Sequence, residues 1–197
     1  MRVPFILSQF HPLAGGAASR YVTGMGGWTE YGLAWVCFLA AHIVPATPAI
    51  RGRLVSALGR RGYLAGFSLL SLALLIWLVR ASGSAPYIRL WDAGGFGRWM
   101  VNLAMPLAIL CGALAVGLSG LMAGFAIWAG AHLVANGDLA HAILFGGMLI
   151  FALAGLARSG VPRSFRPTPL RLLLAVALWI ALIALHPLIV GVSPLPL

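Results

Sequence analysis

Long apolar stretches, separated by short connections that carry arginine, run through most of this chain. Residues 31–50 and 63–79 contain no charged side chain, and residues 99–157 contain only one, Asp138. The last apolar stretch covers residues 172–190. A helix that crosses a bilayer needs about 20 apolar residues. Residues 99–157 therefore have room for three such helices, and each of the other stretches for one.

Turn-forming residues divide the stretch over 99–157 twice. Gly117, Ser119 and Gly120 mark the first turn, and the pair Asn136-Gly137 marks the second. The pattern predicts an all-α fold, a polytopic transmembrane bundle of about six helices near residues 31–48, 63–80, 99–117, 119–135, 139–157 and 171–191.

The composition agrees with a membrane environment. Hydrophobic residues make up 61% of the chain and charged residues only 8%, whereas soluble domains carry roughly 25% charged residues. Too few polar side chains remain to cover a water-facing surface, so the lipid bilayer is the predicted partner. Residues 1–29 are predicted to be a Gly-rich lead-in, and residues 30–197 a single six-helix transmembrane domain.

The charges are mostly positive, with 13 basic residues against three acidic ones. The arginines lie in short connections and not on one exposed face, which argues against nucleic acid as a partner. Such arginines set membrane topology. The side with more of them is predicted to be cytoplasmic, in the inner membrane of a bacterium, with both termini outside. It holds Arg51, Arg53, Arg60, Arg61, Arg158, Arg163, Arg166 and Arg171.

Asp138 follows the second turn directly. It is predicted to lie at an aqueous boundary and to cap the fifth helix, because a carboxylate there accepts hydrogen bonds from free backbone N–H groups. A cysteine at position 137 would then be accessible to labelling. The alternative is that Asp138 is only a solvated turn residue.

Histidines inside the apolar stretches are the main candidates for chemistry, because polar groups at membrane depth are costly. His42 lies in the first predicted helix, His132 in the fourth and His186 in the last, and His141 follows Asp138. A single histidine of this kind usually bridges to a neighbouring helix. Two histidines on separate helices can instead hold a haem iron between them.

Other kinds of site find less support. The sequence has no pair of carboxylates for acid–base catalysis, and no HExxH, CxxC, P-loop or Gly-rich nucleotide-binding motif. Cys37 and Cys111 lie in apolar stretches and are predicted to be packing residues. Gly112, Gly117 and Gly120 are predicted to let helices approach closely.

Three parts of the chain resemble the NnrU family of integral membrane proteins. They are residues 41–55 (AHIVPATPAIRGRLV) with 58–63 (LGRRGY), residues 128–139 (WAGAHLVANGDL), and residues 191–196 (GVSPLP). The resemblance covers most of residues 38–197. The family is related to the zeta-carotene isomerases of plants and cyanobacteria, which are integral membrane enzymes that use haem b.

The resemblance implies a haem b site in this chain. Its axial ligands would be His42 and His132, which match the ligand positions of those relatives. Trp128, one helical turn before His132, would pack against the porphyrin or the substrate. Arg51 and Arg53 would neutralise the haem propionates.

The pairing of the two histidines depends on where the first helix ends. A helix that continues through Pro45 towards Ile50 places His42 near mid-helix, where it can meet His132. A helix that stops at Val44 places His42 at a different depth, by about 6 to 9 Å at the usual rise per residue.

The chain departs from its relatives at two places. Ala129 stands where they carry a cysteine, so no thiolate can exchange with a histidine there. Residues 118–120 replace an Arg-His-Pro motif, which argues against the methyltransferase activity of a related branch and against a direct transfer of isomerase chemistry.

Three functions remain open from the sequence. The first is a haem-dependent cis–trans isomerase of a lipophilic polyene. The second is a non-enzymatic accessory or nitric-oxide-sensing protein that serves a membrane redox complex, since the family name comes from denitrification loci. The third is a structural subunit without a cofactor.

Overall fold

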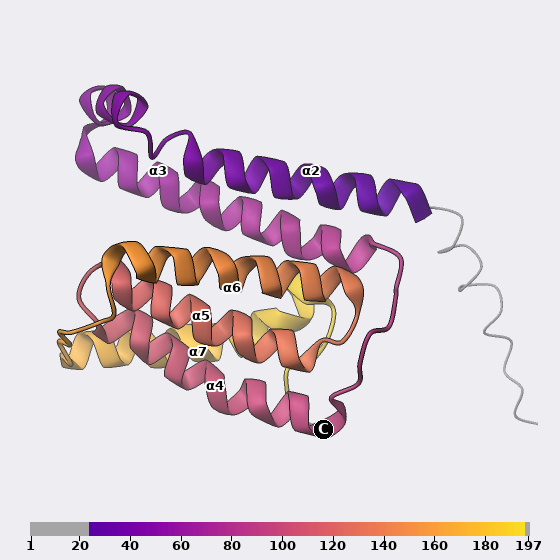
Figure 1. The fold of residues 1–197 in the computed structure, drawn as a ribbon. Coiled ribbons are helices and arrows are strands. Elements are labelled where there is room, and N and C mark those ends of the chain that lie inside the picture. Colours follow the sequence, from indigo (N-terminus) through magenta and orange to yellow (C-terminus); the bar gives the residue numbers. More distant parts are fainter. Residues whose placement is uncertain (1–23, 196–197) are drawn as a thin grey trace, which may run out of the picture.

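The computed structural model describes residues 24–195, which form six helices as predicted. Each helix runs antiparallel to the next one along the chain (Figure 1). The pair α2–α3 packs on α6, and α4, α5 and α7 complete the bundle on the other side of α6. The all-α, polytopic bundle is therefore confirmed. The helices are α2 (Gly24–Ile43), α3 (Pro48–Ser84), α4 (Gly94–Leu114), α5 (Leu118–Ala135), α6 (Leu139–Ser159) and α7 (Pro169–Val190).

Five of these helices, α3 to α7, are long and apolar enough to cross a membrane. Large apolar side chains cover their outer faces, among them Leu103, which is 68% exposed, and Leu188, which is 73% exposed. Such faces are stable against lipid but not against water. The chain is a multi-pass membrane protein. The helix α2, which carries Glu30, is not among the five, so one of the six predicted spans does not meet this criterion.

The first helix differs at both ends from the predicted range of residues 31–48. It begins at Gly24, inside the predicted lead-in, whose residues 1–23 lie outside the described part of the chain. It ends at Ile43 because Val44 precedes Pro45, and a residue before proline is disfavoured in helical conformation. The Thr47 hydroxyl donates to the carbonyl oxygen of Val44 at 2.8 Å and closes the turn.

The second helix begins much earlier than its predicted start at residue 63. Residues 48–58 form a helix of their own, which we call the elbow helix, and it meets the rest of α3 at Gly59. Gly59 has φ 69° and ψ 162°, a conformation that glycine adopts without steric cost. The elbow helix is seen nearly end-on at the upper left of Figure 1, turned away from the long axis of α3.

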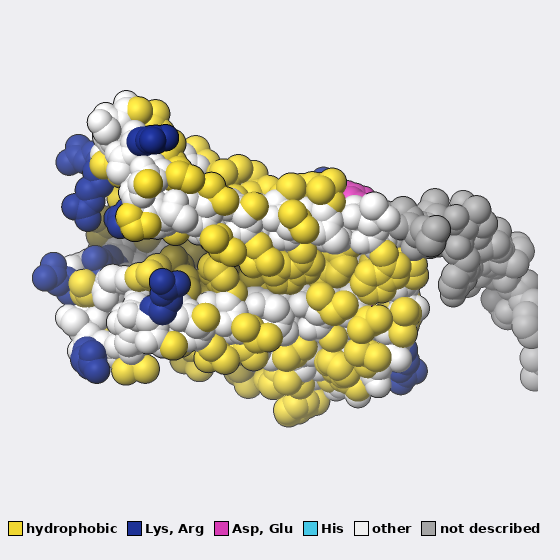
Figure 2. Space-filling model, turned by 45° about the horizontal axis from the view of Figure 1, so that its top comes forward, with side chains coloured by type: hydrophobic (Ala, Val, Ile, Leu, Met, Phe, Trp, Pro, Cys, Tyr) yellow, Lys and Arg dark blue, Asp and Glu magenta, His cyan; other side chains and the backbone are white. Residues whose placement is uncertain are grey.

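The charged residues separate to the two ends of the bundle. One end, here called the arginine end, holds the eight arginines of the two connections predicted to share a side. Basic side chains gather at this end, at the left of Figure 2. The other end, here called the carboxylate end, holds all three acidic residues of the chain, Glu30, Asp92 and Asp138. The arrangement of the helices thus places these eight arginines at one end, as predicted, and the cytoplasmic location of that end stays a prediction.

Close backbone contact joins α4 to α5. A Cβ atom added to Gly124 would lie 2.6 Å from the carbonyl oxygen of Ala108, and one added to Gly120 would collide with Ala115. The predicted close approach is therefore confirmed at Gly120. A Cβ atom added to Gly112 or Gly117 would meet nothing within 4 Å, and Gly124, which was not singled out from the sequence, makes a second close contact.

Candidate functional site

The five residues predicted to form the haem site fall into two groups at opposite ends of the bundle. His132 and Trp128 lie in the second half of α5, towards the carboxylate end. His42 lies in the last turn of α2, and Arg51 and Arg53 lie on the elbow helix, all at the arginine end.

His132 is held in an aromatic environment near the end of α5. Its Nδ1 atom lies 2.9 Å from the carbonyl oxygen of Trp128. Its ring centroid lies 5.4 Å from that of Trp128 and 5.0 Å from that of Phe145 on α6. Trp128 therefore lies beside His132, and its expected contact with a porphyrin or a substrate stays a prediction.

Two further histidines lie at the same end of the bundle as His132. His141 is in the first turn of α6, and His186 is near the end of α7. The Nδ1 atom of His186 lies 2.7 Å from the carbonyl oxygen of Val192, just after the end of α7. We call His132, His141 and His186 the histidine cluster. It brings side chains of α5, α6 and α7 to one end of the bundle.

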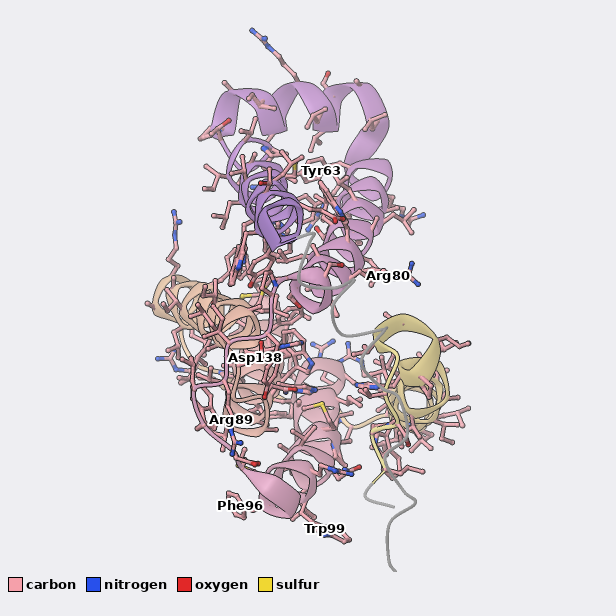
Figure 3. All side chains as sticks on the ribbon, turned by 90° about the vertical axis from the view of Figure 1, so that its right-hand side faces the viewer. Tyr63, Arg80, Arg89, Phe96, Trp99 and Asp138 are labelled. Carbon is pink, nitrogen blue, oxygen red and sulfur yellow. The ribbon has the colours of Figure 1, made fainter. Side chains whose placement is uncertain are left out.

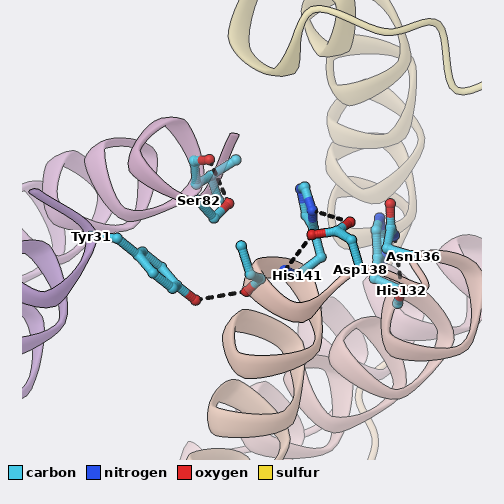
Figure 4. A network of polar contacts seen from close by, with 8 residues as sticks. Tyr31, Ser82, His132, Asn136, Asp138 and His141 are labelled. Carbon is cyan, nitrogen blue, oxygen red and sulfur yellow. Dashed lines mark hydrogen bonds and ion pairs between the residues drawn. The ribbon is translucent and has the colours of Figure 1, made fainter. Parts of the chain in front are cut away.

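Asp138 joins the histidine cluster to the start of α6 (Figure 4). One carboxylate oxygen accepts a hydrogen bond from the backbone N–H of His141 at 3.1 Å, and the other lies 2.7 Å from His141 Nδ1. Asp138 is only 8% exposed. The predicted cap is therefore confirmed, and the alternative of a merely solvated turn residue is wrong.

The connection between α3 and α4 covers the turn that holds Asp138. The backbone N–H groups of Leu90 and Trp91 donate to the carbonyl oxygen of Gly137 at 2.7 and 3.0 Å. A side chain at position 137 would collide with the Trp91 backbone, so free access of a label to that position is not expected. Between the two segments lies a polar cavity of about 290 Å³, whose lining includes Arg89 and Asn136.

Figure 3 looks onto this carboxylate end. Asp138 lies towards the middle of the view, and Arg89 lies nearer the periphery. Phe96 and Trp99 project outwards from the first turns of α4 and are 69% and 58% exposed. Exposed aromatic side chains at a helix end are typical of the boundary between membrane and water.

His42 has a different set of neighbours. Its Nδ1 atom lies 2.7 Å from the carbonyl oxygen of Phe38. Its ring centroid lies 4.2 Å from that of Phe38, 5.4 Å from that of Phe67 and 5.3 Å from that of Phe151. His42 is thus enclosed by α2, α3 and the second half of α6.

The structure does not bring His42 and His132 together. They pack against Phe151 and Phe145, which are six residues apart on α6, or about 9 Å along the helix axis. The helix α6 also lies between α2 and α5. The cause is the end of α2 at Ile43, which leaves His42 in the last turn and not at mid-helix.

The family model described as NnrU protein matches residues 32–194. This chain belongs to the NnrU family. No curated protein and no solved structure matches it. All four histidines just described lie within the matched part of this NnrU protein.

Every described histidine of the NnrU protein is oriented in the same way. Each Nδ1 atom lies against an oxygen: a backbone carbonyl for His42, His132 and His186, and a carboxylate for His141. A carbonyl oxygen only accepts, so the proton of a neutral ring is on Nδ1 and the lone pair is on Nε2. Histidines that bind a metal through one ring nitrogen usually donate a hydrogen bond from the other ring nitrogen in the same way.

The number of ligands decides which kind of metal site is compatible with this orientation. Among residues 24–195, no three His, Cys, Asp or Glu side chains are placed to hold a metal ion. A bare ion such as Zn²⁺ normally needs at least three protein ligands. A haem iron needs only one or two, because the porphyrin supplies the other four.

Replacing Asp138 by alanine should destabilise the protein. The change removes the cap of α6 and leaves the His141 ring without its partner, which together should cost about 1 to 3 kcal/mol. Thermal unfolding of the purified protein in detergent measures the effect. Asp92→Ala is the control. Its carboxylate is 63% exposed, and it loses an ion pair with Arg89, worth about 0 to 1 kcal/mol, and an exposed hydrogen bond from the Gly94 backbone N–H. An equal loss in both variants would contradict the role given to Asp138.

Sequence reasoning missed two parts of this site. It noted His141 and His186 but did not place them at the same end of the bundle as His132, because that placement depends on how α6 and α7 pack. It also missed that residues 88–91 cover the turn that holds Asp138. The turn pair Asn136-Gly137 does not indicate that another segment packs over it. The one available signal was the spacing of Asp138 and His141, which a helix places within a single turn.

Proposed function

We propose that this NnrU protein binds haem b at the carboxylate end of the bundle, with His132 as an axial ligand of the iron. The observation that carries the proposal is the histidine cluster, in which three helices contribute rings that leave Nε2 free. His186 takes the place of His42 as the second ligand, because it lies at the same end of the bundle as His132 and its Nδ1 is likewise fixed by a carbonyl oxygen.

The surroundings of His132 support a haem at this end. Trp128 and Phe145 supply flat apolar surface beside the ring. The polar cavity begins at Ala135, one helical turn beyond His132, and Arg89 is part of its lining. Arg89 is therefore the residue that we expect to neutralise haem propionates. Arg51 and Arg53 are at the other end of the bundle.

We further propose that the protein acts as a non-enzymatic accessory of a membrane redox complex or as a nitric oxide sensor. An isomerase of a lipophilic polyene would need an apolar groove beside the iron. The apolar groove found among residues 45–70 lies at the arginine end, away from His132. A turnover assay with a polyene substrate should accordingly show no product above the level of free haem.

The absorption spectrum of the detergent-purified protein tests the proposal. Two axial histidines should give an oxidised Soret band and, after reduction with dithionite, the sharp α and β bands of a low-spin haem. One haem per chain is expected from the pyridine haemochrome assay. A protein that shows no Soret band, even after expression with added haem precursor and reconstitution with haemin, would favour the cofactor-free structural subunit.

The arginine end should face the cytoplasm of a bacterial inner membrane. Positive residues in short loops are retained on the cytoplasmic side, and eight arginines lie at this end against Arg80, Arg89 and Arg98 among the described residues at the other. A reporter that is active only in the cytoplasm should be active when fused after Arg61. A periplasm-specific reporter that is active at the same position would show the reverse orientation.

A further inference from the structure

We propose that the angle between the elbow helix and the rest of α3 binds one anionic phospholipid. An acyl chain occupies the groove inside this angle, and the phosphate contacts Arg51 and Arg53 on the elbow helix. The site is separate from the proposed haem site, because it lies at the opposite end of the bundle.

The groove is apolar along its whole lining. It has a volume of about 160 Å³ and opens to the outside of the bundle. Leu54 and Leu58 of the elbow helix form one wall, and Phe67 and Leu70 of α3 form the other. An open apolar groove in a membrane protein takes a hydrocarbon chain, since no polar group there satisfies a polar ligand.

The corner that shapes this groove is fixed by local interactions. Gly59 makes the turn that sets the elbow helix at an angle to α3. The Tyr63 hydroxyl donates to the carbonyl oxygen of Pro45 at 3.2 Å and ties the start of the long part of α3 to the turn after α2. Tyr63 and Pro45 also line the groove. The groove is therefore built into the fold at this end.

The charge around the groove selects an anionic headgroup. Arg51 and Arg53 are exposed on the elbow helix, which also contributes Leu54 and Leu58 to the groove. Arg60 and Arg61 follow directly after the corner. All acidic residues of the chain lie at the opposite end, so no carboxylate competes for these guanidinium groups. A short helix with apolar and basic residues is typical of segments that lie in the plane of the membrane surface.

Native mass spectrometry of the protein in detergent tests the proposal with two lipids of equal chain length, phosphatidylglycerol and phosphatidylcholine. The wild type should retain one phosphatidylglycerol in preference to phosphatidylcholine. Neutralisation of both arginines (Arg51→Gln with Arg53→Gln) should weaken phosphatidylglycerol binding by roughly 30-fold, since each basic residue near an anionic lipid contributes about 1 kcal/mol. The matched control is Arg80→Gln with Arg98→Gln at the carboxylate end, where no change is expected.

The acyl chain is tested by filling the groove. Gly66 lines it, and a Cβ atom added there meets nothing within 4 Å, so Gly66→Leu should fold normally and occupy the space of the chain. Retention of both lipids should fall. Gly32→Leu, at an equally open and exposed position on α2, should leave it unchanged. Equal retention of the two lipids by the wild type, or unchanged lipid retention in Gly66→Leu, would overturn the proposal. The haem spectrum should be the same in all these variants, so failure of this proposal is distinguishable from failure of the haem proposal.

Discussion

His132→Ala should lose the haem. The side chain is the proposed ligand, and it combines a fixed Nδ1 proton with aromatic neighbours on two helices. Loss of a residue that only orients a ligand costs about 10- to 100-fold in metal affinity, so loss of the ligand itself should cost at least as much. The absorbance of the purified variant at the Soret maximum, relative to protein, measures this loss.

Added imidazole provides the control for this variant. If His132→Ala folds and lacks only the ligand, imidazole should restore part of the Soret absorbance in the presence of haemin. The far-ultraviolet circular dichroism of the variant should match that of the wild type, because the six helices do not depend on this side chain. A variant with the wild-type spectrum would exclude His132 as a ligand.

Gly124→Leu should have the largest effect on stability. A Cβ at this position would lie 2.6 Å from the carbonyl oxygen of Ala108, and a backbone atom cannot move aside as a side chain can. The helices α4 and α5, which share the most extensive contact in the bundle, would have to separate. Overpacking typically costs about 1 to 3 kcal/mol. At the upper end of that range, the unfolding temperature of a chain of this size should fall by roughly 6 to 12 °C.

Gly130→Leu is the matched control on the same helix. A Cβ atom added to Gly130 meets nothing within 4 Å. Leucine is also a better helix former than glycine, so this variant should be as stable as the wild type or slightly more stable. A similar loss of stability in both variants would mean that leucine at these depths, and not the contact between α4 and α5, is the cause.

The helices could be predicted from the sequence because apolar length alone specifies a membrane span. The boundaries of α5 and α6 lie within two residues of their predicted positions, since Gly117 and the Asn136–Asp138 turn interrupt an otherwise continuous apolar stretch. The elbow helix was missed because residues 48–58 are too short and too basic to look like a span. Its helical state follows from the proline at its start and from the corner at Gly59.

The site could be predicted only in part. The contact of Trp128 with His132 is local to one helix and follows from a spacing of four residues. The second histidine proposed to bind the haem opposite His132 is on another helix. Its identity depends on where each helix ends along the bundle axis. A shift of the end of α2 by a few residues was enough to move His42 away from it. The approach of His186 comes from the packing of α7 in the bundle, which no motif in the sequence encodes.

The oxidised absorption spectra of His42→Ala and His186→Ala, recorded side by side, test the central claim most directly. The claim is that the haem lies at the carboxylate end, with His186 opposite His132. His42→Ala should therefore keep the low-spin spectrum of the wild type. His186→Ala should shift to the high-spin spectrum of an iron that has lost one axial histidine. Loss of the haem or of the low-spin spectrum in His42→Ala, with His186→Ala unchanged, would contradict the account.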